Sequence, residues 1–317
     1  MNKKKAFIIG VSGQDGSYMS KFLIDKKYSV IGYTRSKKKK NLQNLYQLKI
    51  KNKINIKNYS EEYPKIILED ILKFKPNEIY FFSGQSSVSN SFKIPLETYI
   101  SNINILFEIL ELLRSKSLKK VKLFNSTSTD CFGNNNVIYN KEKNFFSPLS
   151  PYAKAKNFSF WIVRYYREQY KIHAKNGILS NHESPLRPSN FVIKKIVDYV
   201  NNPKKKFLQL GNINVYRDWG WAPEFIQAIH KINTAKIPDD YVVGTGKLTS
   251  LKSLVVKIFK SKKIDLKFLK HNNSKSLRNI DIKKIGTNPS KIFKKLKWKS
   301  KVNINQIVKK MLNNELY

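Results

Sequence analysis

Tyr152 and Lys156 are the residues of this chain whose types and spacing could do acid–base chemistry. They stand four apart in the stretch SPYAKAK, where Pro151 marks a predicted helix start, so both side chains lie on one helix face. A tyrosine hydroxyl has a pKa of about 10, and a nearby ammonium favours the phenolate. We therefore expect the pKa of Tyr152 to move towards neutrality, so that this residue can act as a general base. The alternative is a pair on a helix surface, because 17 tyrosines and many lysines produce this spacing by chance.

Ser128 and Asp130 are a second candidate pair, at the end of the predicted strand Val121–Asn125. The stretch LFNSTSTD carries a run of hydroxyl groups and then a carboxylate. A carboxylate at this position could remove a proton from a bound substrate. The alternative for Asp130 is a turn residue that hydrogen-bonds its own backbone, and the residues alone favour that interpretation.

A glycine turn near the N-terminus predicts a nucleotide-binding unit. The apolar run Ala6–Ile9 predicts a strand, Ser17–Lys27 has the apolar spacing of a helix, and the β-branched run that follows predicts a second strand. The glycines between strand and helix allow a tight turn, a close approach of backbone N–H groups to a pyrophosphate, and close packing of helix on strand. We assign this turn to a dinucleotide cofactor through Gly10, Gly13, Gln14, Asp15 and Gly16.

The end of the second strand indicates which dinucleotide is bound. An NAD site would place an acidic residue there, whereas this chain has Arg35 and Ser36. A cation and a hydroxyl favour the 2′-phosphate of NADP. The alternative for Arg35 is a solvated surface charge, since the turn motif is itself only a hypothesis.

The elements that must position these residues alternate between strand and helix. Residues 54–56 predict a third strand, Glu61–Lys73 an amphipathic helix, the EIYFFSG stretch a strand ending beside Gln85, and Pro95–Leu113 a long helix. This alternation predicts an α/β fold with a doubly wound parallel sheet. Ligands on such sheets bind beyond the carboxyl ends of the strands, so Gln85 is also assigned to the cofactor site.

Composition limits the classes of function. The chain has 317 residues, 41% of them hydrophobic, which excludes wholesale disorder. The net charge of +39 raises the question of nucleic acid, but only seven of the 61 basic residues are arginine and the lysines are spread along the whole chain. A nucleic-acid surface concentrates arginines and aromatic residues in one patch, so we expect no nucleic-acid partner.

Cysteine, histidine and hydropathy patterns indicate a metal-free cytoplasmic protein. Cys131 is the one cysteine, so no internal disulfide can form, and the four histidines have no metal-ligand spacing. The N-terminal apolar stretch is too short for a signal peptide, and no segment reaches the ~20 apolar residues that span a bilayer. We expect no bound metal, no membrane partner and a cytoplasmic location.

Several motifs together resemble a known family. GVSGQDGSY, FNSTSTDCFG and SPYAKAK resemble the extended short-chain dehydrogenase/reductase superfamily with its Rossmann-type domain. PNEIYFFSGQSSV, FWIVRYYREQY, GNINVYRDWGWAPEF, LRNIDI and above all NGILSNHESPLRPSNFVIKKI resemble the GDP-mannose 4,6-dehydratases. The similarity covers nearly the whole chain, and the NHESP stretch is its most specific part.

The resemblance implies a reaction and a role for each catalytic residue. Tyr152 would take the proton of the sugar 4-hydroxyl while hydride passes from C4 to NADP, and Lys156 would hold the nicotinamide ribose. Ser128 takes the place of a family threonine that hydrogen-bonds the reacting oxygen. Asp130 takes the place of a family glutamate that removes the C5 proton and assists loss of the C6 hydroxyl as water. Hydride would then return to C6, giving GDP-4-keto-6-deoxymannose.

The resemblance also implies a substrate site, a domain division and an assembly. The residues expected on the GDP-sugar are Ser128, Asn181, Lys195, Arg217, Arg278 and Asp281. Residues 1–182 and 212–240 would form the NADP-binding Rossmann domain, and 183–211 and 241–317 a smaller α/β substrate domain. Trp219 and Trp221 are expected in a core or interface. A homo-oligomer, dimer or tetramer, is expected.

Departures from the family leave two other functions open. Asp130 is one methylene shorter than the family's glutamate, and no acidic residue is evident near the expected adenine position after the third strand. The first alternative is another NAD(P)-dependent nucleotide-sugar epimerase or reductase, which would keep Tyr152 and Lys156 but release no water. The second is a non-catalytic relative that binds a cofactor or a polyanion. The intact Ser128, Tyr152 and Lys156 favour an enzyme.

Overall fold

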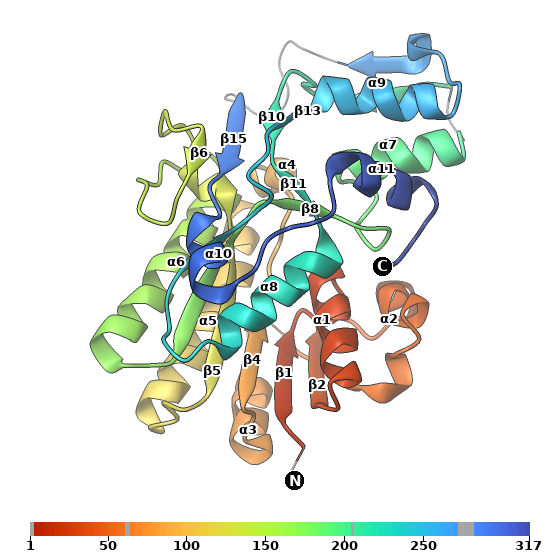
Figure 1. The fold of residues 1–317 in the computed structure, drawn as a ribbon. Helices are drawn as coiled ribbons and strands as arrows, with labels where there is room; N and C mark the ends of the chain where they lie inside the picture. Colours follow the sequence, from red (N-terminus) through yellow and green to blue (C-terminus); the bar gives the residue numbers. More distant parts are fainter. Residues whose placement is uncertain (1–2, 61–63, 204–205, 272–281) are drawn as a thin grey trace.

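A seven-stranded parallel sheet forms the lower part of the molecule (Figure 1). The computed structural model describes residues 3–60, 64–203, 206–271 and 282–317. The strand order is β12-β7-β5-β4-β1-β2-β3. The order runs one way from β1 to β3 and the other way from β4 to β12, so the sheet is doubly wound, as predicted. The strands are β1 Lys5–Ile9, β2 Ser29–Thr34, β3 Asn55–Asn58, β4 Glu78–Phe81, β5 Lys122–Ser128, β7 Ala174–Leu179 and β12 Tyr241–Val243.

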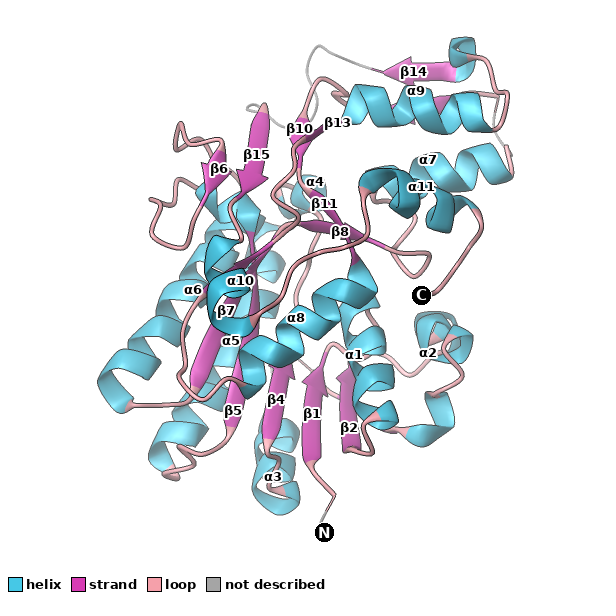
Figure 2. Ribbon diagram, in the orientation of Figure 1, coloured by secondary structure: helices cyan, strands magenta, loops and turns pink. Residues whose placement is uncertain are grey.

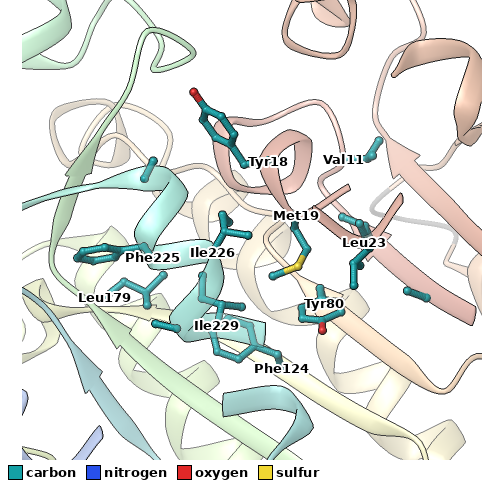
Figure 3. Close-up of a cluster of buried hydrophobic side chains, with 14 of the residues drawn as sticks. Val11, Tyr18, Met19, Leu23, Tyr80, Phe124, Leu179, Phe225, Ile226 and Ile229 are labelled. Atoms are coloured by element: carbon teal, nitrogen blue, oxygen red, sulfur yellow. The ribbon is translucent and has the colours of Figure 1, made fainter. Parts of the chain in front are cut away.

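Helices cover both faces of this sheet (Figure 2). The side chains of β1 alternate, with Ala6 and Ile8 in one buried apolar cluster and Phe7 and Ile9 in another. Figure 3 shows the first cluster, where helices α1 and α8 pack on the strands. The second cluster lies under α3, α5 and α6. The flanking helices are α1 Gln14–Asp25, α2 Gln43–Gln47, α3 Lys65–Phe74, α5 Pro95–Ser115, α6 Pro151–Tyr170, α8 Ala222–Thr234 and α10 Ser290–Leu296.

A smaller α/β unit lies over the carboxyl ends of these strands (Figure 1). It has its own buried apolar core, formed largely by α7, α9 and α11. Its sheets have the orders β13-β10-β15-β6, β11-β8 and β14-β9. Their strands are β6 Tyr139–Asn140, β8 Asn181–Glu183, β9 Leu208–Leu210, β10 Tyr216–Arg217, β11 Trp219–Trp221, β13 Thr249–Ser250, β14 Leu269–His271 and β15 Lys284–Thr287. The remaining helices are α4 Val88–Ser91, α7 Val192–Asn201, α9 Leu251–Ser261 and α11 Ile304–Leu312, with short 3-10 turns η1 Lys39–Asn41, η2 Lys51–Lys53, η3 Thr129–Phe132 and η4 Leu266–Phe268.

The predicted elements agree with the structure apart from their ends. Helix α1 begins at Gln14, three residues before the expected start, and α3 covers Lys65–Phe74. The domain division stays a prediction, and the sheets divide the chain differently at two places. Strand β12 pairs with β7, so residues 241–243 belong to the large sheet. Strands β10 and β11, within 212–240, pair with strands of the smaller unit.

Neither a membrane-spanning helix nor a cluster of metal ligands occurs in the described part of the chain. Within those ranges, no helix combines the length and the apolar character needed to cross a bilayer. The same residues contain no cluster of three histidine, cysteine or acidic side chains placed to hold a metal ion. The cytoplasmic location stays a prediction.

Close packing of the glycine turn predicts a specific stability effect. A Cβ at Gly16 would lie 2.2 Å from Gly10 O and 2.8 Å from the Cα of Val11, whereas a Cβ at Gly13 would lie 3.5 Å from its nearest neighbour, Gly10 O. We expect Gly16→Ala to lower the free energy of unfolding by about 1–3 kcal/mol in equilibrium urea denaturation without cofactor. Gly13→Ala is the matched control and should change it by less than about 1 kcal/mol. Equal effects of the two variants would contradict this account.

Candidate active site

A cleft of about 1160 Å³ lies where the carboxyl ends of the parallel strands meet the smaller unit. Most of the predicted site residues line it: Gly10, Gly13, Gln14, Asp15, Gly16, Arg35, Ser36, Ser128, Asp130, Tyr152, Lys156, Asn181, Lys195 and Arg217. Gln85 lines an adjoining pocket of about 540 Å³, which shares Arg35 with the cleft. Arg278 and Asp281 lie outside the described residues. The structure thus brings together residues more than 200 positions apart in the sequence.

The glycine turn presents a helix N-terminus to the cleft. Gly10 has a φ of +91°, and the Gly13 N–H donates to Gly10 O at 3.1 Å, which closes the turn. Helix α1 starts directly after Gly13, and no described side chain caps it there. Free backbone N–H groups and the helix dipole make such an end a favourable place for a phosphate group.

The side chains of Gln14 and Asp15 connect this turn to strand β8. Gln14 Nε2 donates to His182 O at 3.2 Å, and Ser184 Oγ donates to Gln14 Oε1 at 2.8 Å. His182 Nε2 lies 3.0 Å from Asp15 Oδ1. Burial alone would raise the pKa of Asp15, but the charge and hydrogen bond of His182 lower it to about 2. These two side chains thus join the two halves of the cleft, and their contact with a cofactor stays a prediction.

The four predicted catalytic residues stand at the ends of β5 and α6. Ser150 Oγ caps α6 by accepting from Ala153 N at 3.1 Å, and this fixes the turn that carries Tyr152. Lys156 follows one helical turn later, and its Nζ donates to Ser126 O at 2.9 Å. Ser128 ends β5, and its Oγ accepts from the N–H of Asp130 at 3.1 Å.

The pKa of Tyr152 departs from the sequence-based expectation. Burial raises this pKa above its ordinary value and the Asp130 carboxylate raises it further, while a hydrogen bond with Ser128 and the charge of Arg187 lower it. In the ligand-free protein, burial therefore outweighs the effect of the nearby lysine on this pKa. The shift towards neutrality that we expect when a positively charged nicotinamide is also bound stays a prediction. The same burial lowers the pKa of Lys156 to about 8.

The predicted substrate residues come from three elements of the smaller unit. Asn181 lies on β8, Lys195 on α7 and Arg217 on β10. Lys195 Nζ donates to Gln209 O at 2.7 Å, and Arg217 Nη1 donates to Tyr216 O at 2.8 Å. Trp219 and Trp221 are almost fully buried in the core of this unit, as expected.

Arg187 is a cleft residue that the sequence analysis missed. Its guanidinium donates to His182 O at 2.9 Å and lies 4.0 Å from the centre of the Phe191 ring. It is close enough to Tyr152 and Asp15 to lower the pKa of each. Its position two residues after NHESP, in a chain with few arginines, was the available signal.

Hydroxyl groups that follow β1, β2 and β4 also line the cleft. Ser12 Oγ lies 2.9 Å from Thr34 Oγ1, next to Arg35 and Ser36. Tyr59, directly after β3, hydrogen-bonds Ser83. Tyr59 thus lines the region where the resemblance led us to expect an acidic residue.

Comparisons with known proteins agree with this geometry. A family model described as GDP-mannose 4,6 dehydratase matches residues 7–311. The chain is 33% identical over 345 residues to the GDP-mannose 4,6 dehydratase of Dictyostelium discoideum, covering 99% of this chain and 96% of that protein. It is 36% identical over 280 residues to the GDP-mannose 4,6-dehydratase of Vibrio cholerae, covering 85% and 74%.

Solved structures show the same fold at low sequence identity. UDP-glucose 4-epimerase from Thermotoga maritima, with UDP-glucose, has a TM-score of 0.87 at 18% identity, and 98% of each chain is covered. The dTDP-glucose 4,6-dehydratase from Streptomyces venezuelae, with NAD bound, has a TM-score of 0.87 at 15% identity, with 98% and 96% covered. From the family model and the full-length identity to known members, the chain belongs to the GDP-mannose 4,6-dehydratase family, which are hydro-lyases with the extended short-chain dehydrogenase/reductase fold.

Proposed function

We propose that this protein converts GDP-mannose to GDP-4-keto-6-deoxymannose and water, with NADP as cofactor. The observation that carries the proposal is the gathering of Ser128, Asp130, Tyr152 and Lys156 in one cleft. Gly13 at the uncapped start of α1 and Arg217 of β10 line the same cleft. A cofactor phosphate and a substrate diphosphate could thus be held in the cleft that contains these four side chains.

The cleft has features that fit a dinucleotide. Gly13 and the first residues of α1 line the cleft, so a pyrophosphate could approach their backbone N–H groups. The hydroxyl of Ser180 lines the cleft, is buried and has no hydrogen-bond partner among the described residues, so it is available to a ligand that reaches it. When bound, NADP would supply the redox chemistry, taking hydride from C4 of the sugar and returning it to C6.

Arg35 and Ser36 support NADP over NAD. Both line the cleft directly after β2, where a carboxylate would repel the extra phosphate of NADP. Arg35 can form charge-assisted hydrogen bonds with that phosphate, and Ser36 can donate a further one. Gly10, Gly13, Gln85 and Lys156 would hold the remainder of the cofactor.

The sugar diphosphate would lie under the smaller unit. Arg217 presents a planar fork of donors that suits a diphosphate, with Asn181 as a neutral donor and Lys195 as a second cation. Ser128 and Tyr152 then face the sugar beyond the β5 strand end. We also propose that Arg278 and Asp281, which lie outside the described residues, contact the GDP.

Two of these side chains would move protons. Tyr152 takes the proton of the 4-hydroxyl, with the Ser128 hydroxyl on the same oxygen. Oxidation at C4 makes the C5 proton acidic, and Asp130 removes that proton while the C6 hydroxyl leaves as water. Asp130 is only half-buried, and it receives no hydrogen bond to its carboxylate from the described residues, so the carboxylate is free to act as a base.

The length of Asp130 favours one competing function. A proton-transfer group misplaced by about 1 Å can lose on the order of a hundredfold in rate. If Asp130 cannot reach C5, the same Tyr152 and Lys156 would support oxidation and reduction at C4 without loss of water, as in a nucleotide-sugar epimerase or reductase.

A second copy of this chain is the partner that we propose for the helices α5 and α6. They pack side by side, with the rings of Phe107 and Tyr166 in contact. Phe107, Phe158, Trp161 and Tyr165 are 42–52% exposed, and on α6 the spacing of 158, 161 and 165 places three aromatic side chains on one helix face. Exposed apolar surface of this kind is typical of an interface between subunits.

The reaction is tested by its product. Purified protein incubated with GDP-mannose and NADP in deuterated water should give a 4-keto-6-deoxy sugar with deuterium at C5, seen by NMR and mass spectrometry. A product that keeps the 6-hydroxyl, with altered configuration or oxidation at C4, would replace this proposal by the epimerase or reductase. NADP binding with no turnover of any nucleotide sugar would support a non-catalytic relative.

Two variants of Asp130 test its role in that assay. Asp130→Asn should slow water loss by about 10²–10⁴-fold, because an amide cannot accept the C5 proton. It should leave NADP affinity unchanged, since the substitution is isosteric. Asp130→Glu restores the longer side chain of the family and should retain activity or raise it. Unchanged dehydration in Asp130→Asn would remove this residue from the mechanism.

The assembly is tested by light scattering after size-exclusion chromatography. The wild-type particle should have two or four times the mass of the 37.1 kDa chain. Trp161→Glu combined with Tyr165→Glu should shift it to the monomer, because charges would be buried in the interface. Ile237→Glu is the matched control, since Ile237 is 75% exposed in the segment after α8. A wild-type monomer would contradict the proposal.

A further inference from the structure

Asp218 is a buried carboxylate that none of the chemistry above uses. It lies between β10 and β11, directly after Arg217, and is 1% exposed. Its oxygens accept from Thr245 N at 3.0 Å, Thr245 Oγ1 at 2.6 Å and Gly246 N at 2.9 Å, and also from the hydroxyl of Thr287. Burial of a carboxylate is costly unless donors surround it, and here four donors do.

These hydrogen bonds join segments that are distant in the sequence. Thr245 and Gly246 follow β12, the edge strand of the large sheet, and Thr287 ends β15 of the smaller unit. The packing around the carboxylate is tight, since a Cβ at Gly244 would lie 2.1 Å from Thr287 Oγ1 and 2.8 Å from Asp218 Oδ2. Asp218 therefore holds the segment after β12 and the end of β15 within hydrogen-bond distance of one carboxylate.

The same segments hold the backbone of Arg217 from both sides. Arg217 pairs with Thr249 of β13 on one side and with Ile285 of β15 on the other. Strand β13 begins three residues after Gly246, and β15 ends at Thr287. Both strands that flank Arg217 are thus close in the chain to residues that bind the Asp218 carboxylate, and Figure 1 shows β10, β13 and β15 side by side in the upper part of the molecule.

We propose that Asp218 is a positioning residue that holds Arg217 in place for the substrate diphosphate. This inference rests on the proposed function, which gives Arg217 its diphosphate ligand. Bidentate recognition by a guanidinium depends on a fixed direction of the side chain, so an anchor at the next residue contributes to affinity without touching the substrate.

The proposal is tested first by the binding of GDP and NADP, measured separately by titration calorimetry. In Asp218→Asn, an amide NH₂ group replaces one carboxylate oxygen that accepts hydrogen bonds. This NH₂ group would face backbone N–H groups, which are donors as well. We expect GDP affinity to fall by about tenfold and NADP affinity to change less than about twofold. The matched control is Glu78→Gln, a carboxylate that is also buried but accepts from Tyr28 and Tyr80 at the start of β4. It should leave GDP affinity unchanged.

A double-mutant cycle separates positioning from general damage. If Asp218 acts through Arg217, adding Asp218→Asn to Arg217→Met should weaken GDP binding by less than about twofold beyond Arg217→Met alone. Unchanged GDP affinity in Asp218→Asn, or additive losses in the double variant, would overturn the inference. If Asp218→Asn does not fold, Thr287→Val replaces it in the same cycle, with an expected loss of about threefold.

The cycle also distinguishes failure of this inference from failure of the proposed function. Wild-type protein that binds NADP but not GDP would overturn the GDP-sugar substrate and, with it, the role of Asp218. If the wild type binds GDP, and both Asp218→Asn and Thr287→Val bind it with the same affinity as the wild type, only the role of Asp218 is overturned.

Discussion

The contact between Asp15 and His182 is the interaction on which the arrangement of the cleft depends. Asp15 lies in the first turn of α1, where the cofactor phosphates would bind, and His182 lies on β8 of the smaller unit. His182 Nδ1 donates to Ser180 O at 2.7 Å, and its ring stacks on Phe225 of α8 at 4.7 Å between centroids. The ring is thereby fixed, and the glycine turn is fixed to it.

The rest of the substrate side follows from that contact. Strand β8 pairs in register with β11, which places Trp219 beside Asn181. Directly before β11 stand Arg217 and Asp218, and Asp218 fixes the ends of the neighbouring segments. Hydrogen bonds, strand pairing and the chain itself thus connect helix α1 to the backbone of Arg217. In the proposed function, this connection would set the separation between the cofactor and diphosphate sites.

Burial is the constraint that governs the chemistry at the centre. It raises the pKa of Tyr152 and lowers that of Lys156, so both groups favour their neutral forms more than they would in water. The same exclusion of water strengthens every electrostatic interaction of a bound ligand. In the proposed reaction, Tyr152 would therefore need the charge of a bound cofactor to act as a base, so that proton transfer would depend on occupancy of the cleft.

The sequence predicted what depends on short-range patterns. Apolar periodicity and glycine spacing indicated β1, α1, α5 and α6, and the four-residue spacing placed Tyr152 and Lys156 on one turn. Contacts between distant segments were beyond such patterns. Nothing local shows that Asp15 binds a histidine 167 positions away, or that Asp218 joins residues 245 and 287. Strand β12 has only three residues, too few for a periodicity to appear, so its pairing with β7 could not be predicted from the sequence.

The most direct test of the account is a crystal structure of the Tyr152→Phe variant with NADP and GDP-mannose, in which the sugar should remain intact. We predict that the cofactor pyrophosphate lies at the N-terminus of α1 and the GDP diphosphate at Arg217. We also predict that the sugar 4-hydroxyl lies about 2.6–3.2 Å from Ser128 Oγ, with Asp130 facing C5. A sugar bound with C4 away from Ser128, or a diphosphate away from Arg217, would contradict the central claim that one cleft holds both ligands across these residues.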